Sequence, residues 1–245
     1  MIMAQSGAGH VSNVANFESL INLCTVFGTM YNPGSNHIQL PTLQTKATEA
    51  LAVLQATRLA KVNYDDATNA REITFESLKK LSTRIVNALK ATTASEQKID
   101  DAKTIVRKIQ GSRKKNTPPE VPVAGEVVPR KNSVTQQGYG DLLENFTKLV
   151  GVIATEPLYL PNEEALQLTS LNALIIDLKA SSTVVTNMEH NYSTARIQRD
   201  EVLYAPNNGM VDLALAAKVY VKSCFGASSP QYKQLGGLEF RRLIS

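Results

Sequence analysis

The chain has 245 residues, 43% of them hydrophobic, and a formal net charge of +4, so it can bury a core and is too apolar to be disordered. No apolar run approaches the roughly 20 residues that span a bilayer, and residues 1–16 show no secretory leader pattern. We therefore expect a soluble, cytoplasmic protein. Aromatic residues make up only 6% and tryptophan is absent, which favours an aliphatic core of the kind found in helical bundles.

The first half of the chain is predicted to be helical after a disordered N-terminus over residues 1–12. Residues 42–110 contain neither glycine nor proline, the two strongest helix breakers. Pro33 and Gly34 mark a turn, and Pro41 suits the first turn of a helix. Hydrophobic spacing predicts four helices here, at about residues 13–31, 40–74, 75–92 and 95–110.

The middle segment, residues 111–138, predicts a flexible linker, because its prolines and charges oppose a packed element. Residues 111–137 carry five basic and only two acidic side chains. Such a cluster is compatible with a solvated linker, or with contact to nucleic acid or another anionic surface. No aromatic residue lies among the cations, so stacking on bases has no support. The five cations are Arg113, Lys114, Lys115, Arg130 and Lys131.

The second half resumes an apolar helical face at about Tyr139. Residues 162–205 form another long stretch without breakers, and residues 206–209 form a loop. Residues 210–225 then predict a helix that ends at Gly226. Ser229 followed by Pro230 predicts the N-cap and first turn of a short last helix.

The two halves resemble each other at a constant offset of 128 residues. Over residues 31–71, 10 of 41 positions are identical, including Tyr31 with Tyr159 and Leu40 with Leu168. We therefore predict an all-α fold with two tandem copies of one unit, residues 13–110 and 139–245, each with short, long, medium and short helices. The copies are expected to form an antiparallel bundle with pseudo-two-fold symmetry. Two small bundles joined by a flexible tether are the alternative.

The long helix of each copy carries a stripe of apolar and small residues at spacings of three and four, typical of a packed inner face. In the first copy it runs Leu43, Ala47, Ala50, Leu54, Thr57, Ala60, Tyr64, Ala67, Arg71 and Thr74. In the second it runs Leu171, Ile175, Leu178, Ser182, Val185, Met188, Tyr192, Ala195, Arg199 and Val202.

Four residues of this stripe are predicted to form a structural seam: Tyr64, Arg71, Tyr192 and Arg199. A buried guanidinium needs a partner, so the two arginines are expected in salt bridges. Two arginines related by the repeat could instead bind an anion such as phosphate. The tyrosines are expected to be core residues with satisfied hydroxyls rather than ligand contacts.

No pattern of catalytic or metal-binding residues emerges from the sequence. The histidines lack partners at metal spacing, no Cys-x-x-Cys occurs, and Cys24 and Cys224 lie in apolar stretches as small buried residues. The sequence shows neither a nucleophile turn nor a glycine-rich nucleotide loop. We expect no cofactor, no metal and no enzymatic activity.

The expected function is that of a non-enzymatic helical scaffold that contacts a protein partner or copies of itself. A nucleic-acid-associated protein acting through the basic linker is the first alternative, and it predicts binding that weakens steeply with salt. A membrane-active helical protein is the second alternative, although Lys148, Asp177 and Lys218 interrupt its apolar stretches and no integral membrane association is expected. An enzyme of unfamiliar type is the remaining one.

Overall fold

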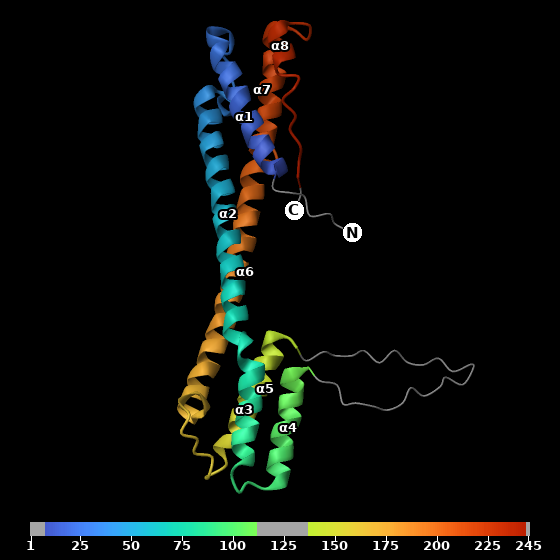
Figure 1. The fold of residues 1–245 in the computed structure, drawn as a ribbon. Coiled ribbons are helices and arrows are strands. Elements are labelled where there is room, and N and C mark those ends of the chain that lie inside the picture. The colour runs from blue at the N-terminus through green and yellow to red at the C-terminus, as the bar shows by residue number, and fades with distance from the viewer. Residues whose placement is uncertain (1–7, 112–136, 244–245) are drawn as a thin grey trace, which may run out of the picture. The chain divides into compact units, whose positions relative to one another are not determined.

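The computed structural model describes residues 8–111 and 137–243, and every regular element in these ranges is a helix (Figure 1). The α-helices are α1 (Ala8–Val26), α2 (Leu40–Glu76), α3 (Leu78–Lys90), α4 (Glu96–Gln110), α5 (Tyr139–Ala154), α6 (Leu168–Tyr204), α7 (Met210–Phe225) and α8 (Pro230–Gln234). Three short 3₁₀ turns lie at Gly28–Met30, Asn36–Ile38 and Glu164–Leu166. The all-helical prediction is therefore confirmed for the described residues.

The first helix begins earlier than the sequence predicted. Residues 8–12 belong to α1, although they were assigned to a disordered N-terminus. Tertiary contacts explain the difference, since His10 is buried and its Nδ1 lies 2.7 Å from the hydroxyl of Tyr204. Such contacts stabilise a helix end that has no local capping signal.

The described residues fall into two compact units. Unit 1 contains the described residues up to Asp65 and those from Asn187 onward, and unit 2 contains the described residues between Asp66 and Thr186. The boundary lies within α2 and α6, so each of these helices contributes to both units. Each compact unit therefore draws on both halves of the chain.

Unit 1 is built around α1 and α7, which pack against each other. Their apolar faces meet the first part of α2 and the last part of α6 in one core. Phe17 and Cys24 on α1 and Met210 on α7 are fully buried. Leu235, just after α8, is also fully buried, so the chain beyond α7 belongs to the same core.

Unit 2 is built around α3, α4 and α5, with α4 packed against both other helices (Figure 1). The helix α4 has a well-defined start and end, because Ser95 caps its N-terminus and Gly111 ends it in the left-handed conformation at φ 72°. Phe146 on α5 is fully buried at the centre of this core.

The inner stripe of each long helix faces protein rather than solvent. In α2, Leu43 and Ala50 are fully buried, and in α6, Leu171 and Leu178 are fully buried. Every other residue of the two stripes is buried or half-buried. Exposed apolar residues of α2, such as Leu59 and Ile73, lie off the stripe.

We predict that the thiol of Cys24 stays unreactive in the folded protein. Burial raises its pKa from 9.0 to about 12, so at about pH 8 almost no thiolate is present. Because the unfolded thiol loses its proton more readily, the free energy of unfolding should fall as the pH rises from 9 towards 12. In a Cys224→Ser variant, a thiol reagent should modify Cys24 only at the rate of unfolding. Rapid modification without denaturant would contradict this prediction.

Within the described ranges, no helix combines the length and apolar character needed to cross a bilayer.

Candidate functional site

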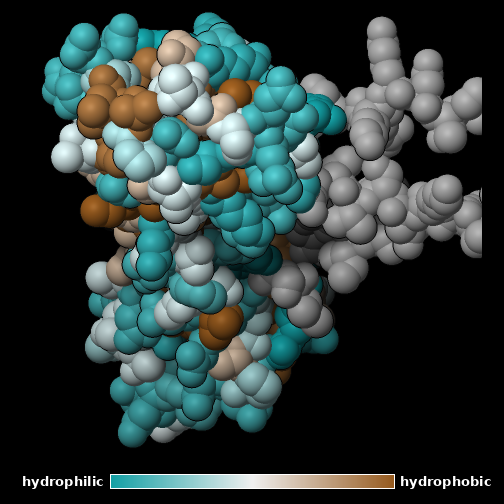
Figure 2. Space-filling model, turned by 90° about the horizontal axis from the view of Figure 1, so that it is seen from below, coloured by the Kyte–Doolittle hydropathy of each residue, from teal (hydrophilic) through white to brown (hydrophobic). Residues whose placement is uncertain are grey.

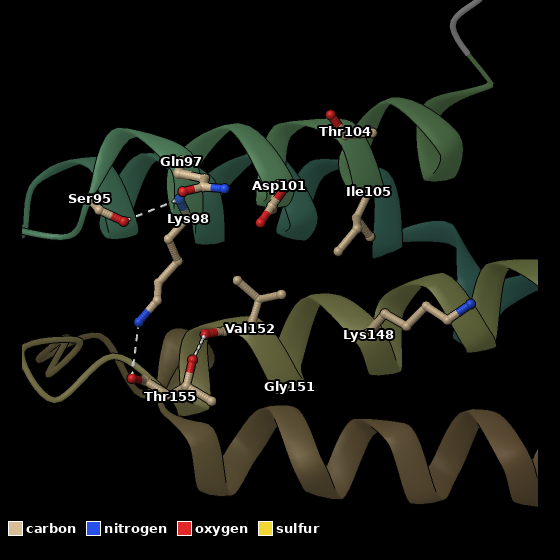
Figure 3. A pocket seen from close by; sticks show the side chains of 10 residues that line it. All are labelled: Ser95, Gln97, Lys98, Asp101, Thr104, Ile105, Lys148, Gly151, Val152 and Thr155. Atoms are coloured by element: carbon tan, nitrogen blue, oxygen red, sulfur yellow. Dashed lines mark hydrogen bonds between the residues drawn. The ribbon is translucent and has the colours of Figure 1, made fainter.

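The strongest candidate for a binding surface is a groove between α4 and α5 in unit 2 (Figure 3). Its volume is about 730 Å³. On α4, Ala102, Val106 and Ile109 are buried in the core, and the groove is lined by the flank of the helix beside them, which includes Ile105. The lining residues are Ser95, Gln97, Lys98, Asp101, Thr104, Ile105, Lys148, Gly151, Val152 and Thr155.

The groove has an apolar middle and a polar rim. Ile105 from α4 and Val152 from α5 are half-buried and contribute the apolar surface. Lys98, Asp101 and Lys148 supply charges of both signs around it. A hollow of this composition fits an amphipathic helix, whose apolar side chains would enter the middle while its polar side chains meet the rim.

Gly151 keeps part of the groove open. A Cβ atom built on this residue would have no atom within 4 Å apart from its own helix and chain neighbours. Glycine inside a helix costs roughly 1 kcal/mol relative to alanine. Its backbone conformation is helical and its surroundings would accept a larger side chain, so packing does not explain the glycine.

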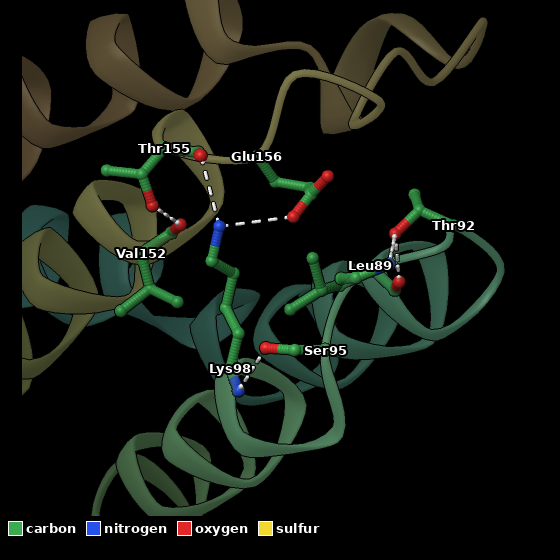
Figure 4. A network of polar contacts seen from close by, with 8 residues as sticks. Leu89, Thr92, Ser95, Lys98, Val152, Thr155 and Glu156 are labelled. Atoms are coloured by element: carbon green, nitrogen blue, oxygen red, sulfur yellow. Dashed lines mark hydrogen bonds and ion pairs between the residues drawn. The ribbon is translucent and has the colours of Figure 1, made fainter.

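Lys98 fastens the start of α4 to the end of α5 (Figure 4). Its Nζ donates to the carbonyl oxygen of Thr155 at 3.0 Å and lies 3.1 Å from Oε2 of Glu156. Thr155 is the C-cap of α5, where the helix dipole favours a cation. Glu156 is largely buried, with a side chain 10% exposed, so this ion pair is better shielded than the pairs on the outer helix faces.

The surface of unit 2 also exposes apolar side chains next to a second hollow. Figure 2 shows a mostly hydrophilic face with separate hydrophobic patches. Leu158 and Leu160, in the connection between α5 and α6, are 54% and 79% exposed. They line a hollow of about 520 Å³ together with residues of α3 such as Arg84. Exposed apolar residues beside a hollow are typical of interaction surfaces.

Two of the predicted seam residues meet in unit 1. The rings of Tyr64 and Tyr192 are stacked, with centroids 6.3 Å apart and an interplanar angle of 13°. Nearby, the hydroxyl of Thr57 donates to the carbonyl oxygen of Ala195 at 3.1 Å. These contacts join α2 to α6 through small and aromatic side chains.

Arg199, the third seam residue, is buried in unit 1 and paired. Its Nε and Nη2 donate to Oδ1 of Asp200 at 2.8 and 2.6 Å. Arg199 and Tyr192 line a cavity of about 400 Å³ that also takes in Arg58 and Lys61. The cations of this cavity would attract an anion, but Lys61 is held by Asp65 and Arg199 by Asp200, which offsets much of the charge.

His10 and Tyr204 form a buried polar pair beside Arg199. Burial, followed by the positive charge of Arg199, lowers the pKa of His10. Burial likewise raises the pKa of Tyr204, whose hydroxyl also accepts from Nδ2 of Asn13 at 3.3 Å. Both groups are therefore neutral at physiological pH, which suits a structural role.

Arg71, the remaining seam residue, lies in unit 2 and has a different partner from Arg199. Its guanidinium carbon is 4.1 Å from the ring centroid of Tyr139, a cation–π contact. The expected salt bridge is absent within the described residues, where its buried Nε has no hydrogen-bond partner. An aromatic face replaces the carboxylate here because Tyr139, at the start of α5, packs against both Arg71 and Phe75.

The five predicted linker cations, Arg113, Lys114, Lys115, Arg130 and Lys131, lie outside the described residues. The positions flanking this part of the chain are described, and they adjoin each other. Nε2 of Gln137 donates to the carbonyl oxygen of Lys108 at 2.8 Å, and a Cβ built on Gly111 would lie 2.8 Å from the side chain of Gln137. Gly111 and Gln137, which flank residues 112–136 in the sequence, therefore lie side by side in unit 2.

We predict that replacing residues 112–136 with four glycine and serine residues preserves the fold. Because Gly111 and Gln137 already lie side by side, four residues can join them, and a shorter connection costs less conformational entropy to close. The free energy of unfolding should therefore stay unchanged or rise by about 1 kcal/mol. Thermal denaturation followed by circular dichroism measures this. If the chain binds nucleic acid through its basic linker, the same variant should lose the salt-sensitive part of that binding. A marked fall in melting temperature would show that this segment is part of the core.

Sequence reasoning missed several polar residues that make tertiary contacts, among them Lys98 in unit 2 and Asn13 in unit 1. Lys98 and Asn13 gave no sequence signal beyond being polar residues near apolar helix faces. Asn13 is 2% exposed, which only the tertiary structure reveals. In the described part of the chain, no group of three or more metal-binding side chains occurs.

No protein-family model, curated protein or solved structure matches this chain.

Proposed function

We propose that this protein is a non-enzymatic helical scaffold that binds an amphipathic helix of a protein partner, or of another copy, in the groove between α4 and α5. The observation that carries the proposal is the groove itself, with Ile105 and Val152 in its middle and charged residues at its rim. The Lys98 contacts to Thr155 and Glu156 hold α4 and α5 in register, so the groove is organised before a partner arrives.

The same proposal includes a duplicated, antiparallel architecture. In its support, α2 and α6 both have 37 residues and start 128 residues apart, and 3₁₀ turns precede them at the same spacing. Tyr31 donates to the carbonyl of Ile38, and Tyr159 donates to the carbonyl of Leu166. The α2–α6 contacts pair rising residue numbers in α2 with falling ones in α6, which supports an antiparallel arrangement.

The test uses Gly151, which lines the groove and where an added Cβ atom would meet no atom within 4 Å. Gly151→Phe should block partner binding, whereas Gly151→Ala should leave binding intact and stabilise α5 by roughly 1 kcal/mol. Size-exclusion chromatography with light scattering, at low and high salt, first establishes whether the chain associates with itself. A defined oligomer that survives high salt should dissociate in the Gly151→Phe variant.

If the unmodified chain is a monomer in both salts, the same pair of variants is used as bait for a partner. Gly151→Phe should then lose a protein that Gly151→Ala retains. Equal masses and equal captured proteins for the two variants would contradict the proposal.

A further inference from the structure

Beyond α8, the chain leaves the helical pattern and runs along the outside of α1 and α7. Residues 238–243, which we call the strap, are joined to the fully buried Leu235 by Gly236 and Gly237 and contain no regular element (Figure 1). In unit 2, by contrast, a full helix, α4, packs against the neighbouring helices α3 and α5. The strap therefore covers a helical surface with extended rather than helical chain.

Three residues on one face of α1 contact the strap at every second strap residue. Nδ2 of Asn16 donates to the carbonyl oxygen of Glu239 at 2.8 Å. Asn13 makes two bonds to Arg241, donating to its carbonyl oxygen at 2.7 Å and accepting from its N–H at 3.1 Å.

The third contact lies one helical turn before Asn13. A methyl group added at Gly9 would lie 2.6 Å from Cδ1 of Leu243, so the missing side chain makes room for the strap.

The spacing of these contacts follows from backbone geometry. Gly9, Asn13 and Asn16 are separated by four and three residues, so they share one face of α1. Seven helical residues rise about 10.5 Å, and four extended residues span about 13 Å. The rise of one turn of α1 is thus close to the length of two extended strap residues, which explains a contact at every second strap residue. Since Asn16, Asn13 and Gly9 meet Glu239, Arg241 and Leu243 in that order, the strap runs antiparallel to α1.

Side chains of the strap add a recognisable pattern to these backbone contacts. Leu238 and Phe240 pack against the core of unit 1. Arg242 forms an ion pair with Asp212, whose pKa is lowered first by the N–H of Asn207 and then by Arg242. Lys218 donates to the carbonyl oxygen of Leu238 at 2.9 Å. An extended segment with apolar residues two apart and an arginine two further on therefore fits this surface.

We propose that the face of unit 1 formed by α1 and α7 is a peptide-binding groove whose second occupant, besides the strap of its own chain, is the strap of another copy. The hydrogen bonds from the side chains of Asn13 and Asn16 to the strap backbone carry this inference. They recognise an extended backbone whichever copy of the chain supplies it. When two copies exchange straps, each strap makes in the other copy the contacts that it makes in its own, so the dimer needs no new interface. The inference goes beyond the proposed function, since it concerns a different surface, in unit 1, and a different ligand, an extended segment rather than a helix.

At low protein concentration, the strap of the same chain occupies the groove in preference to the strap of another copy, because it is tethered nearby. Because a short connection tethers the strap to its own groove, its effective concentration there is on the order of millimolar or higher. Gly236 and Gly237, both exposed, form this connection after Leu235. Exchange therefore dominates where copies are concentrated or where the connection is too short to fold back.

The first experiment separates the strap from its groove. A protease sequence is inserted between Gly236 and Gly237 of the full chain, the chain is cut, and a fluorescent peptide of residues 237–245 is added. We expect saturable binding by fluorescence polarisation. Asn13→Ala should weaken that binding by at least about tenfold, because it removes two hydrogen bonds to the strap. The matched control is Asn22→Ala, an exposed asparagine on the same helix.

The second experiment tests the partner. Deleting Gly236 and Gly237 shortens the connection so that the strap cannot reach its own groove, and the chain should then become a dimer by light scattering. Excess strap peptide, or Asn13→Ala, should return it to a monomer.

Absence of peptide binding by a cut chain that stays helical by circular dichroism would overturn the proposal, as would a monomeric deletion variant. If the cut chain unfolds, the uncut Asn13→Ala chain decides: the amide of Arg241 should exchange its hydrogen faster than in Asn22→Ala, and equal rates would overturn the proposal. A negative result here with the Gly151 effects intact would leave the α4–α5 groove as the interaction site.

Discussion

Replacing Phe146 with alanine is expected to lower the free energy of unfolding by about 4 kcal/mol, and Phe17→Ala should have a similar effect. Both rings are fully buried, Phe17 in the core of unit 1 and Phe146 in the core of unit 2. Each is followed three residues later by a fully buried leucine, Leu20 on α1 and Leu149 on α5. Urea denaturation followed by circular dichroism measures both changes.

The control for this pair is Val219→Ala, since Val219 is 67% exposed and its removal leaves no cavity. That variant should stay within about 0.5 kcal/mol of the unmodified chain. If one phenylalanine variant were nearly neutral while the other lost several kcal/mol, α1 and α5 would not be equivalent parts of a duplicated unit.

Arg199→Leu is expected to cost about 3 kcal/mol, whereas Arg196→Leu should cost less than about 1 kcal/mol. Arg199 is 8% exposed and its loss leaves the half-buried carboxylate of Asp200 without its arginine. Arg196 lies off the inner stripe and makes only a distant contact, 5.8 Å from the ring centroid of Tyr192. For a chain of this size, the difference corresponds to a gap of roughly 5 °C or more in melting temperature.

A double variant sharpens this test. If the cost of Arg199→Leu comes from the loss of its ion pair with Asp200, then Arg199→Leu combined with Asp200→Asn should recover part of the lost stability. Equal thermal shifts for Arg199→Leu and Arg196→Leu would mean that the inner face of α6 has been assigned wrongly.

Local signals located most of the helices. The breaker-free stretch over residues 42–110 contains most of α2 and all of α3 and α4, and the stretch over residues 162–205 contains α6. The predicted helix over residues 210–225 has the bounds of α7. Ser229 caps α8, accepting from the N–H of Tyr232, as the Ser-Pro pair predicted. These features depend on residues close together in the chain, such as caps, prolines and hydrophobic spacing, so they can be recognised without knowing the fold.

Features that depend on distant residues could not be predicted. Arg71 and Arg199 occupy equivalent positions of the two stripes, yet one meets Tyr139 and the other Asp200. The hydrogen bonds between Asn13 and Arg241 join residues 228 apart, which no local pattern encodes. Which helices belong to which compact unit could not be predicted either. Hydrophobic periodicity identifies the buried face of a helix but does not say which other element covers that face.

The neighbouring positions of Gly111 and Gln137 have a counterpart in the contact between Gly9 and Leu243. At each of these places, two residues that are separated in the sequence lie next to each other. A circular permutant that starts at Gln137, joins Leu243 to Gly9 through a short connector and ends at Gly111 could therefore keep the contacts of both cores. This permutant would place residues 137–243 ahead of residues 9–111 in the sequence, so the order in which the two halves are synthesised would change while the contacts of both cores stay the same.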